Sequence, residues 1–334
     1  MLRIGSDFSG VGAFEFSLKR LGISYVNCFA CDMDKYARET YLLNHEKPNN
    51  FPTDVYKRKI PKESLDIYMT SPPCQAFSQS GKRLGKEDER GILFFNSHQF
   101  IKKNKPRYFI FENVEGLTSI DEGRTFKEWL NYLGGKSING LPVLFADENA
   151  VPYHIYYKII NAKDFNIPQN RKRIFIVGIR DDEDNFFQFP KEERLTKNLS
   201  NLLEEKFDLK YILRNKDIID LIINKEGKGI KIKSATLKGF ENVNEGDSFN
   251  FSLPNSKTRR GRVGKKVAQT IQAQNFQATL HKNIIRRLTP KECFKLMDFP
   301  SNFIWKCSDN QAYKQAGNSI VVKCLEKIIE KFKL

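Results

Sequence analysis

The sequence predicts a doubly wound α/β fold joined to a second, smaller domain of mainly β and irregular structure. Short apolar segments alternate with amphipathic segments through the N-terminal half, which is the pattern of strands and covering helices. The alternation stops at about Asp181, and the composition shifts to Lys, Asn and Gly as far as about Arg286. The helical signal returns at Leu288. We therefore expect one domain from residues 1–180 plus 287–334, and a second domain from 181–286.

The elements of the first domain follow from periodicity. Buried strands are expected at Leu2–Ser6, Tyr25–Ala30, Asp66–Thr70 and Arg107–Phe111, and helices at Phe14–Leu21, Lys35–Leu43, Ile92–Lys102 and Thr125–Tyr132.

Later segments are expected to extend this domain. Residues 134–151 are rich in Gly and Asn and indicate a surface loop, and two strands follow at Tyr153–Ile160 and Arg173–Ile179. Thr289-Pro290 is a cap and first-turn pair, and an amphipathic helix is expected from about Ser319 to the C-terminus, packed on the first domain. The segment Gly229–Thr236 is β-like.

The charge favours a polyanionic partner. Lys and Arg exceed Asp and Glu by 56 to 40 among 334 residues, although a lysine-biased genome would also raise this number. Clustering is the stronger signal, because residues 257–266 read KTRRGRVGKK. We expect this segment to contact phosphates or guanines. No apolar run is long enough to cross a membrane and no cleavable leader is visible, so we expect a cytoplasmic protein.

The cysteine pattern indicates a reduced protein without a zinc site. Six cysteines show no secreted spacing, and the Cys28-x-x-Cys31 pair lacks a second pair or nearby histidines. Two buried small residues are the better interpretation of that pair. Only Cys74 stands in a setting that suggests chemistry.

The first strand leads into DFSGVGAF, residues 7–14. Gly10 and Gly12 allow a tight strand-to-helix turn that leaves the helix N-terminus open to a ligand. The dinucleotide spacing G-x-G-x-x-G fails at Glu15. Asp32 ends the second strand, where a carboxylate can accept hydrogen bonds from a ribose diol, and Asp54 can bind an adenine amino group. Solvated loop carboxylates are the alternative.

A thiol and a carboxylic acid follow neighbouring strands. In SPPCQAFSQSGKRLGKEDERGILFF, residues 71–95, two prolines stiffen the backbone before Cys74, and a polar, glycine-bearing stretch typical of a mobile lid comes next. The following strand delivers Glu112-Asn113 to the same edge of the sheet. A thiolate can add to an electron-poor ring if an acid such as Glu112 neutralises charge elsewhere on the ring.

These segments together resemble the DNA (cytosine-5)-methyltransferase family, in particular its single-chain bacterial restriction-modification members. FSGVG is similar to the cofactor loop, PPCQAFS to the nucleophile loop and ENV to the acidic strand. QNRKRIFIVG, RRLTPKECFKLMDFP and QAGNSIVV match three further segments in the same order. The resemblance covers the chain except residues 134–151 and 181–286.

The resemblance implies methyl transfer from S-adenosyl-L-methionine, which leaves as S-adenosyl-L-homocysteine, to carbon 5 of a cytosine flipped out of duplex DNA. Cys74 would attack carbon 6, Glu112 would hold ring nitrogen 3 and the amino group, Arg173 and Arg171 would steady Glu112 and the base carbonyl, and Asn113 would organise the loop. The residues carried over to cofactor binding are Phe8, Gly10, Val11, Gly12, Asp32, Met33, Asp54, Val55, Pro73, Leu93, Asn318 and Ser319.

On the DNA side, residues 181–286 would be a target-recognition domain. The candidate contacts are Ser78, Ser80, Arg90, Arg259, Arg260, Arg262, Lys265, Gln272 and Gln274, because Arg suits guanine and Gln suits adenine. The family suggests a monomer in the bacterial cytoplasm at the nucleoid, with no metal and no membrane contact, and with a restriction endonuclease encoded separately.

Two departures from the family pattern stand out. The family usually has Asp-Leu before F-x-G, whereas this chain has Ser6-Asp7, so the acid is expected to face differently because a one-residue shift on a strand reverses the face. Met33 stands where an aromatic is frequent, and as a soft apolar side chain it can still cover an adenine.

Three other functions deserve comparison. A relative of this family methylates tRNA, but its typical Cys-Phe-Thr element is absent from this sequence. A catalytically silent DNA-binding module would be expected to lack Cys74 or Glu112. A nicotinamide-dependent oxidoreductase rests on the α/β pattern alone.

Overall fold

The computed structural model describes residues 1–73, 91–183, 186–214, 218–226 and 229–334. Within these residues the chain forms two compact units. The first comprises residues 1–160, 172–191 and 324–334, and the second comprises 161–171 and 192–323. These units are defined by packing. The domains expected at 1–180 plus 287–334 and at 181–286 are defined by their roles in catalysis and DNA recognition. The division into those two domains stays a prediction.

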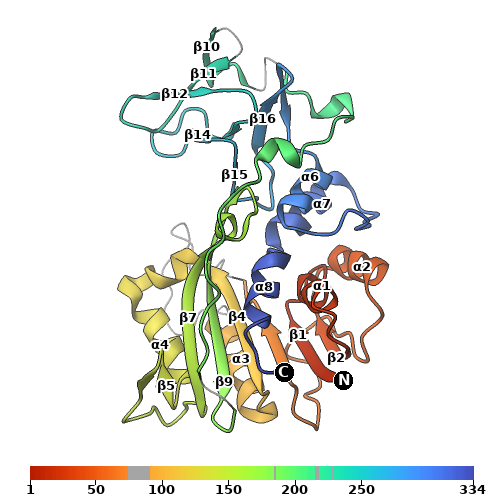
Figure 1. The fold of residues 1–334 in the computed structure, drawn as a ribbon, viewed down its shortest axis with the longest axis vertical. Coiled ribbons are helices and arrows are strands. Elements are labelled where there is room, and N and C mark those ends of the chain that lie inside the picture. Colours follow the sequence, from red (N-terminus) through yellow and green to blue (C-terminus); the bar gives the residue numbers. More distant parts are fainter. Residues whose placement is uncertain (74–90, 184–185, 215–217, 227–228) are drawn as a thin grey trace. The chain divides into compact units, whose positions relative to one another are not determined.

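The first unit is built on a mixed sheet of eight described strands in the order β2-β1-β3-β4-β9-β7-β5-β6 (Figure 1). Its strands are β1 (Leu2–Asp7), β2 (Tyr25–Cys31), β3 (Ile67–Thr70), β4 (Tyr108–Val114), β5 (Ser137–Ile138), β6 (Leu141–Pro142), β7 (Tyr153–Asn161) and β9 (Lys172–Arg180). Its helices are α1 (Ala13–Arg20), α2 (Lys35–Asn44), α3 (Gly91–Asn104) and α4 (Arg124–Leu133), with 3-10 turns at Glu115–Thr118 and Ile120–Gly123.

The strand order confirms the doubly wound prediction. β1 pairs in parallel with β2 on one side and with β3 on the other, β3 pairs in parallel with β4, and β4 pairs antiparallel with β9. The chain therefore reverses direction across the sheet between β2 and β3. In such sheets the crevice at the strand carboxyl ends beside the reversal is the usual ligand site.

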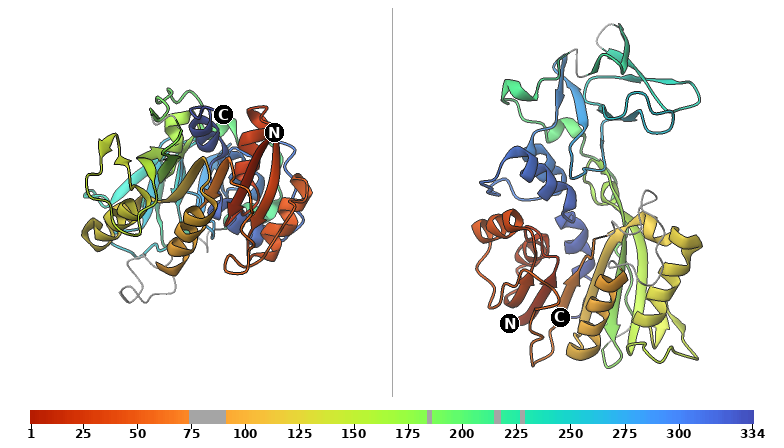
Figure 2. Two further views of the ribbon diagram at one scale, coloured as in Figure 1. Left: turned by 90° about the horizontal axis from the view of Figure 1, so that it is seen from below. Right: turned by 180° about the vertical axis from the view of Figure 1, so that it is seen from behind.

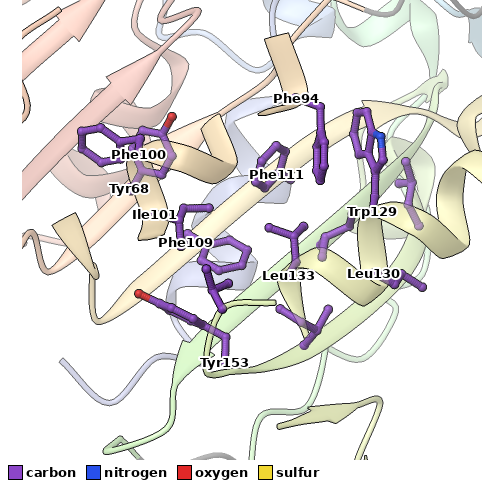
Figure 3. Packing of buried hydrophobic residues seen from close by; sticks show 14 of the residues in the cluster. Tyr68, Phe94, Phe100, Ile101, Phe109, Phe111, Trp129, Leu130, Leu133 and Tyr153 are labelled. Atoms are coloured by element: carbon purple, nitrogen blue, oxygen red, sulfur yellow. The ribbon is translucent and has the colours of Figure 1, made fainter. Parts of the chain in front are cut away.

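The apolar strands are buried because helices cover both faces. α3 and α4 lie together on one face (Figure 2), where Phe94 stacks on Trp129 with ring centroids 4.1 Å apart. Phe109 and Phe111 of β4 join the same aromatic core (Figure 3). Tyr108 precedes Phe109 by one residue and therefore faces the opposite side of the sheet. Its ring stacks there on that of Phe332, with ring centroids 4.5 Å apart.

The C-terminal segment packs on the first unit, as expected. Arg20 of α1 forms an ion pair with Glu326 of α8 at 3.6 Å. The expected helix from about Ser319 to the C-terminus is longer than the observed α8, Val322–Ile329. Ser319 is extended and caps the preceding helix α7 (Asp309–Asn318), which the sequence interpretation had not identified.

The surface segment 134–151 contains a short hairpin that the predicted loop lacked. β5 and β6 pair antiparallel around Asn139-Gly140, and both of these residues have positive φ. Asn-Gly is the preferred pair for a two-residue hairpin turn of this kind, so the local chemistry explains the correction.

The second unit is mainly strands and irregular segments, as expected for much of 181–286. Its sheets run β10-β11-β12, β14-β13-β16-β17 and β15-β8. Its strands are β8 (Gln169–Asn170), β10 (Ile222–Glu226), β11 (Gly229–Lys233), β12 (Phe240–Val243), β13 (Ser248–Asn250), β14 (Gly261–Gly264), β15 (Ala268–Gln269), β16 (Gln277–His281) and β17 (Ile284–Arg287). It also holds α6 (Pro290–Leu296), α7, and 3-10 turns at Ala162–Phe165, Leu199–Asn201 and Leu209–Tyr211.

Two features hold the second unit together. Ile230, Ile232, Phe249 and Leu280 belong to its buried apolar cluster. Thr289 caps α6 as predicted, because its hydroxyl accepts from the Glu292 amide while the Glu292 carboxylate accepts from the Thr289 amide.

We expect Phe94→Ala to destabilise the protein by about 3–5 kcal/mol, because it removes a buried ring and leaves a cavity against Trp129. Phe145→Ala is the matched control, since that ring is 94% exposed. Urea unfolding followed by circular dichroism measures both. Equal unfolding free energies for the two variants would contradict the assigned core.

His45 gives a second prediction, on pH. Its ring is buried between Phe16 and Tyr41, at centroid distances of 4.4 and 4.8 Å, and burial, reinforced by the Lys19 cation, lowers its pKa to about 3. The unfolded chain binds a proton at His45 below about pH 6.5. The folded chain binds this proton only near pH 3, so the free energy of unfolding falls as the pH is lowered from about 6.5 toward 3.

The unfolding free energy of the wild type should therefore fall by about 2 kcal/mol more than that of His45→Phe between pH 7.5 and pH 5. Phenylalanine keeps the ring packing and cannot titrate. Taking the difference between the two proteins removes the contribution of the carboxyl groups that titrate in both. Parallel pH profiles for the two proteins would show that His45 is protonated in the fold.

Candidate active site

The carboxyl ends of four neighbouring strands lie at one edge of the first unit. The register pairs Asp7 with Cys31 and with Thr70, and Thr70 with Phe111. The residues one step further along the chain are therefore Phe8, Asp32, Ser71 and Glu112. The structure thus brings the predicted glycine loop, the predicted ribose-binding acid, the acidic strand and residues 71–73 before the predicted nucleophile to the same edge.

The glycine loop is held against the end of β2. The Gly10 amide donates to Asp32 Oδ2 at 2.8 Å, and the Asp34 amide donates to Asp32 Oδ1 at 2.8 Å. The Ser9 amide donates to the Cys31 carbonyl at 3.0 Å. Burial raises the pKa of the Asp32 carboxyl, and the two amides oppose that shift. Asp32 therefore stands at the end of β2 and also holds the glycine loop in place there.

The two glycines of this loop both have positive φ, which favours glycine, but their surroundings differ. Gly12 has φ +85°, and a Cβ there would stand 2.2 Å from Nε2 of His45. Gly10 has φ +55°, and a Cβ there would meet nothing within 4 Å. Space therefore lies open above the Gly10 backbone, as an approaching ligand needs. Val11 between them is buried.

The surroundings of Asp32 suit a ligand with a flat apolar ring and a diol. Met33 is 86% exposed, although it is a large apolar side chain. The Ser9 hydroxyl is buried and has no hydrogen-bond partner in the described part of the chain. Asp54 is half-buried and accepts from the Tyr56 amide at 2.9 Å, while Val55 is buried. Together these residues fit the adenosine portion of S-adenosylmethionine.

Asn113 ties the acidic strand to the segment before the predicted nucleophile. Its amide nitrogen donates to the Pro72 carbonyl at 3.1 Å, and its carbonyl oxygen accepts from the Val114 amide at 2.8 Å. Pro73 is exposed and Leu93 of α3 is half-buried. Cys74, Ser78, Ser80 and Arg90 lie outside the described residues.

Glu112 and Arg173 form an ion pair across neighbouring strands. Arg173 Nε lies 3.1 Å from Glu112 Oε1, and Glu112 is 8% exposed. Val114 pairs with Arg173 and Glu112 with Phe175, so the two side chains are diagonal neighbours on one face of the sheet. The predicted Glu112–Arg173 contact is therefore present.

Arg171 belongs to the second unit. It is buried, and its guanidinium donates to the carbonyls of Ile271, Gly317 and Ser319 at 2.7–2.9 Å. A Cβ on Gly317 would stand 2.2 Å from the Gln272 backbone, so these two segments are in close contact. Arg171 thus holds together segments predicted to bind DNA and cofactor, and its contact with Glu112 or a base stays a prediction.

The other predicted residues of the second unit differ in exposure. Gln272, Gln274 and Asn318 are exposed, whereas Ser319 is buried.

The cationic run 257–266 divides into bound and exposed side chains. Arg260 donates to the Ser234 carbonyl at 3.0 Å, and Lys265 lies 3.0 Å from the Asp247 carboxylate. Arg259 and Arg262 are exposed, and within the described residues their side chains form no hydrogen bond or ion pair. These last two cations are available to an anionic partner.

Sequence reasoning missed a buried ion pair beside the glycine loop. Asp7 is 1% exposed, and Arg58 lies against it at 2.7 Å. The available signal was the acid at Asp7 in an apolar strand, because a buried carboxylate generally needs a cation or several hydrogen bonds.

Of the two cysteines expected to be buried, Cys31 is buried and Cys28 is half-buried. Cys28 is left unpaired at a register shift between β1 and β2, and it packs against the same apolar cluster to which Cys31 belongs. Burial raises the pKa of Cys31 to about 12. The described residues contain no group of three or more His, Cys, Asp or Glu side chains placed to hold a metal ion, and none of their helices is long and apolar enough to span a membrane.

Curated relatives resemble this chain along nearly its full length. It is 34% identical over 332 residues to the type II methyltransferase M.DsaV of Dactylococcopsis salina, covering 97% of this chain and 84% of that protein. It is 32% identical over 330 residues to the type II methyltransferase M.HhaI of Haemophilus parahaemolyticus, covering 98% and 93%.

Solved structures share the fold. The S. pombe Dnmt2 methyltransferase superposes with a TM-score of 0.64 at 19% identity, covering 99% of this chain and 97% of that one. A putative DNA modification methyltransferase from an E. coli prophage gives a TM-score of 0.66 at 19% identity, covering 99% and 98%.

The family model described as C-5 cytosine-specific DNA methylase matches residues 2–334. With the relatives and the strand-edge geometry, this match confirms the resemblance found in the sequence: the chain belongs to the C-5 cytosine-specific DNA methylase family.

Proposed function

We propose that this protein transfers the methyl group of S-adenosyl-L-methionine to carbon 5 of a cytosine flipped out of a specific duplex DNA sequence, with Cys74 as covalent nucleophile. The observation that carries the proposal is the pairing of Glu112 with Arg173 beside Asn113, whose amide holds the carbonyl of Pro72 two residues before Cys74. An acid and the approach to a thiol therefore share one strand edge.

Each residue has a chemical task in this proposal. The Cys74 thiolate adds to carbon 6 of the cytosine ring, and Glu112 hydrogen-bonds ring nitrogen 3 and the exocyclic amino group, so that electron density moves to carbon 5. Arg173 orients the Glu112 carboxyl through the 3.1 Å contact. After methylation at carbon 5, loss of the proton there eliminates the thiolate and restores the ring.

The cofactor contributes one element of chemistry: when bound, it supplies an electrophilic methyl group on a sulfonium and leaves as S-adenosyl-L-homocysteine. Asp32 would accept from its ribose, Phe8 and Met33 would cover its adenine, and the open backbone at Gly10 would let it approach. Support comes from the 86% exposure of Met33, the buried Ser9 hydroxyl without a partner and the space above Gly10.

For the DNA partner, the exposed Arg259, Arg262, Gln272 and Gln274 are proposed contacts, Arg with phosphates or guanine and Gln with adenine. Ser78, Ser80 and Arg90 would approach the space left by the flipped base. The restriction-modification setting, a separately encoded endonuclease, a monomeric state and a cytoplasmic, nucleoid-associated location complete the proposal, in keeping with type II relatives.

The test is methyl transfer from labelled S-adenosylmethionine to mixed-sequence duplex DNA, with 5-methylcytosine mapped by sequencing. We expect site-specific methylation by the wild type, none by Cys74→Ser, and a rate about 10²–10⁴ lower for Glu112→Gln, which keeps the shape but cannot transfer a proton. Cys28→Ser, a half-buried cysteine on β2, is the matched control and should retain wild-type activity.

The same assay with tRNA as substrate separates the nearest alternative. Faster methylation of tRNA than of duplex DNA would replace the DNA substrate in this proposal. Cofactor binding without methylation of either nucleic acid would favour a silent DNA-binding module. Full activity of Cys74→Ser would remove the covalent step.

A further inference from the structure

Four side chains, three of them buried and one half-buried, form a polar network beneath the strand ends of the first unit. Arg58 Nε lies 2.8 and 2.7 Å from the two Asp7 carboxylate oxygens, and Arg58 Nη2 lies 2.7 Å from Oδ2. The Tyr68 hydroxyl donates to Asp7 Oδ2 at 2.6 Å, and Arg58 Nη2 donates to the Asn96 side-chain carbonyl at 3.0 Å. Asp7, Arg58 and Tyr68 are 1%, 8% and 0% exposed.

Aromatic rings fix the orientation of this guanidinium. The Arg58 Cζ lies 4.4 Å from the centre of the Phe100 ring and 5.9 Å from that of Phe29. Tyr68 in turn stacks on Phe100 at 4.3 Å, and both rings appear in Figure 3. A planar guanidinium can stack and donate in two directions at once, whereas a lysine ammonium cannot reproduce that geometry.

Asp7, Arg58 and Asn96 each stand close in the sequence to a residue of the proposed cofactor site. Asp7 directly precedes Phe8, whose φ of +57° is unusual for a residue with a side chain. Arg58 itself follows Asp54 by four residues. Asn96 stands on α3 three residues after Leu93, about one helical turn. One guanidinium therefore connects three segments that are distant in the sequence.

Stability alone does not account for this network. Replacing a buried ion pair by well-packed apolar side chains is often neutral or stabilising, because desolvation of the two charges offsets their attraction. The family pattern has a leucine where this chain has Asp7, so an apolar alternative is available at this position. A directional contact, in contrast to an apolar one, specifies the angle at which the joined segments meet.

We propose that Arg58 is a positioning residue for the S-adenosylmethionine pocket, acting through Asp7 on the Phe8–Gly12 loop and through Asn96 on α3. Arg58 does not touch the cofactor in this proposal. It sets the separation of Phe8, Asp54 and Leu93, so its loss weakens cofactor binding more than it slows the chemical step. This inference rests on the proposed function.

The test uses the full-length protein with Arg58→Lys, which keeps the positive charge and loses the forked, stacked geometry. Titration calorimetry with S-adenosylmethionine should give a Kd about tenfold higher than that of the wild type, a change of about 1.4 kcal/mol. The kcat for DNA methylation at saturating cofactor should stay within about threefold, because positioning is recovered once the cofactor is bound.

Arg107→Lys is the matched control. Arg107 also contacts two carboxylates, Glu183 at 2.8 Å and Asp66 at 3.1 Å, but it precedes β4 at the opposite, amino end of the strand. Its Kd for S-adenosylmethionine should remain within about twofold of the wild type, even where thermal stability falls.

Asn96→Ala removes the contact with α3 alone and keeps the Asp7–Arg58 pair, so it tests the proposal even where Arg58→Lys fails to fold. We expect its Kd to rise about threefold to fivefold, in line with the loss of one charge-assisted hydrogen bond. A folded Arg58→Lys or Asn96→Ala that binds the cofactor as tightly as the wild type would overturn the positioning role. Absence of binding by the wild type itself would instead overturn the proposed function.

Discussion

The parallel pairing of β1 with both of its neighbours is the constraint on which the rest of the first unit depends. The chain leaves β1 for β2, then returns past β1 to reach β3. Right-handed connections on the two sides of this reversal must run over opposite faces of the sheet. The glycine loop and the segment leading to Cys74 consequently follow neighbouring strand ends, beside the reversal where ligands usually bind in such sheets.

The buried carboxyl groups near this edge are stabilised by different kinds of neighbouring group. Asp7 has the Arg58 guanidinium, Asp32 has two backbone amides, and Glu112 has Arg173. Glu15, behind the glycine loop, accepts from the Tyr41 hydroxyl at 2.9 Å, and burial raises its pKa. A carboxyl whose cation is a neighbour on the adjacent strand can be steered toward a substrate, whereas one enclosed by uncharged groups favours its protonated form.

Much of the first unit could be predicted because its strands are short apolar runs separated by amphipathic helices. β1 to β4 and α1 to α4 lie where periodicity placed them, and the convergence of Asp32 and Glu112 at one edge follows from the parallel order alone. The β5–β6 hairpin was missed because the Asn139-Gly140 signal is only two residues long. Helix α7 was missed because, apart from Tyr313, its buried face consists of small and polar residues such as Ala312, Gln315 and Ala316.

The partners of buried polar groups could not be predicted, because they come from distant parts of the chain. Nothing local to Asp7 identifies Arg58, which lies 51 residues further along. Arg171 and Arg173 stand two residues apart in one motif, yet Arg173 pairs with Glu112 in the first unit while Arg171 binds three backbone carbonyls in the second. The sequence resemblance implies for both arginines the role of steadying Glu112 and the base carbonyl, whereas in the structure the two side chains have different contacts.

The cationic run of the second unit illustrates the same limit at the surface. Charge counting treats KTRRGRVGKK as one patch, but Arg260 and Lys265 already bind groups of their own unit. Those two contacts fasten either end of β14 to neighbouring segments, at the Ser234 carbonyl and at Asp247. Arg260 and Lys265 thereby hold in place the segment that bears the exposed Arg259 and Arg262. Part of the positive charge therefore orders the loop, and only the remainder is free to lower the free energy of a bound polyanion.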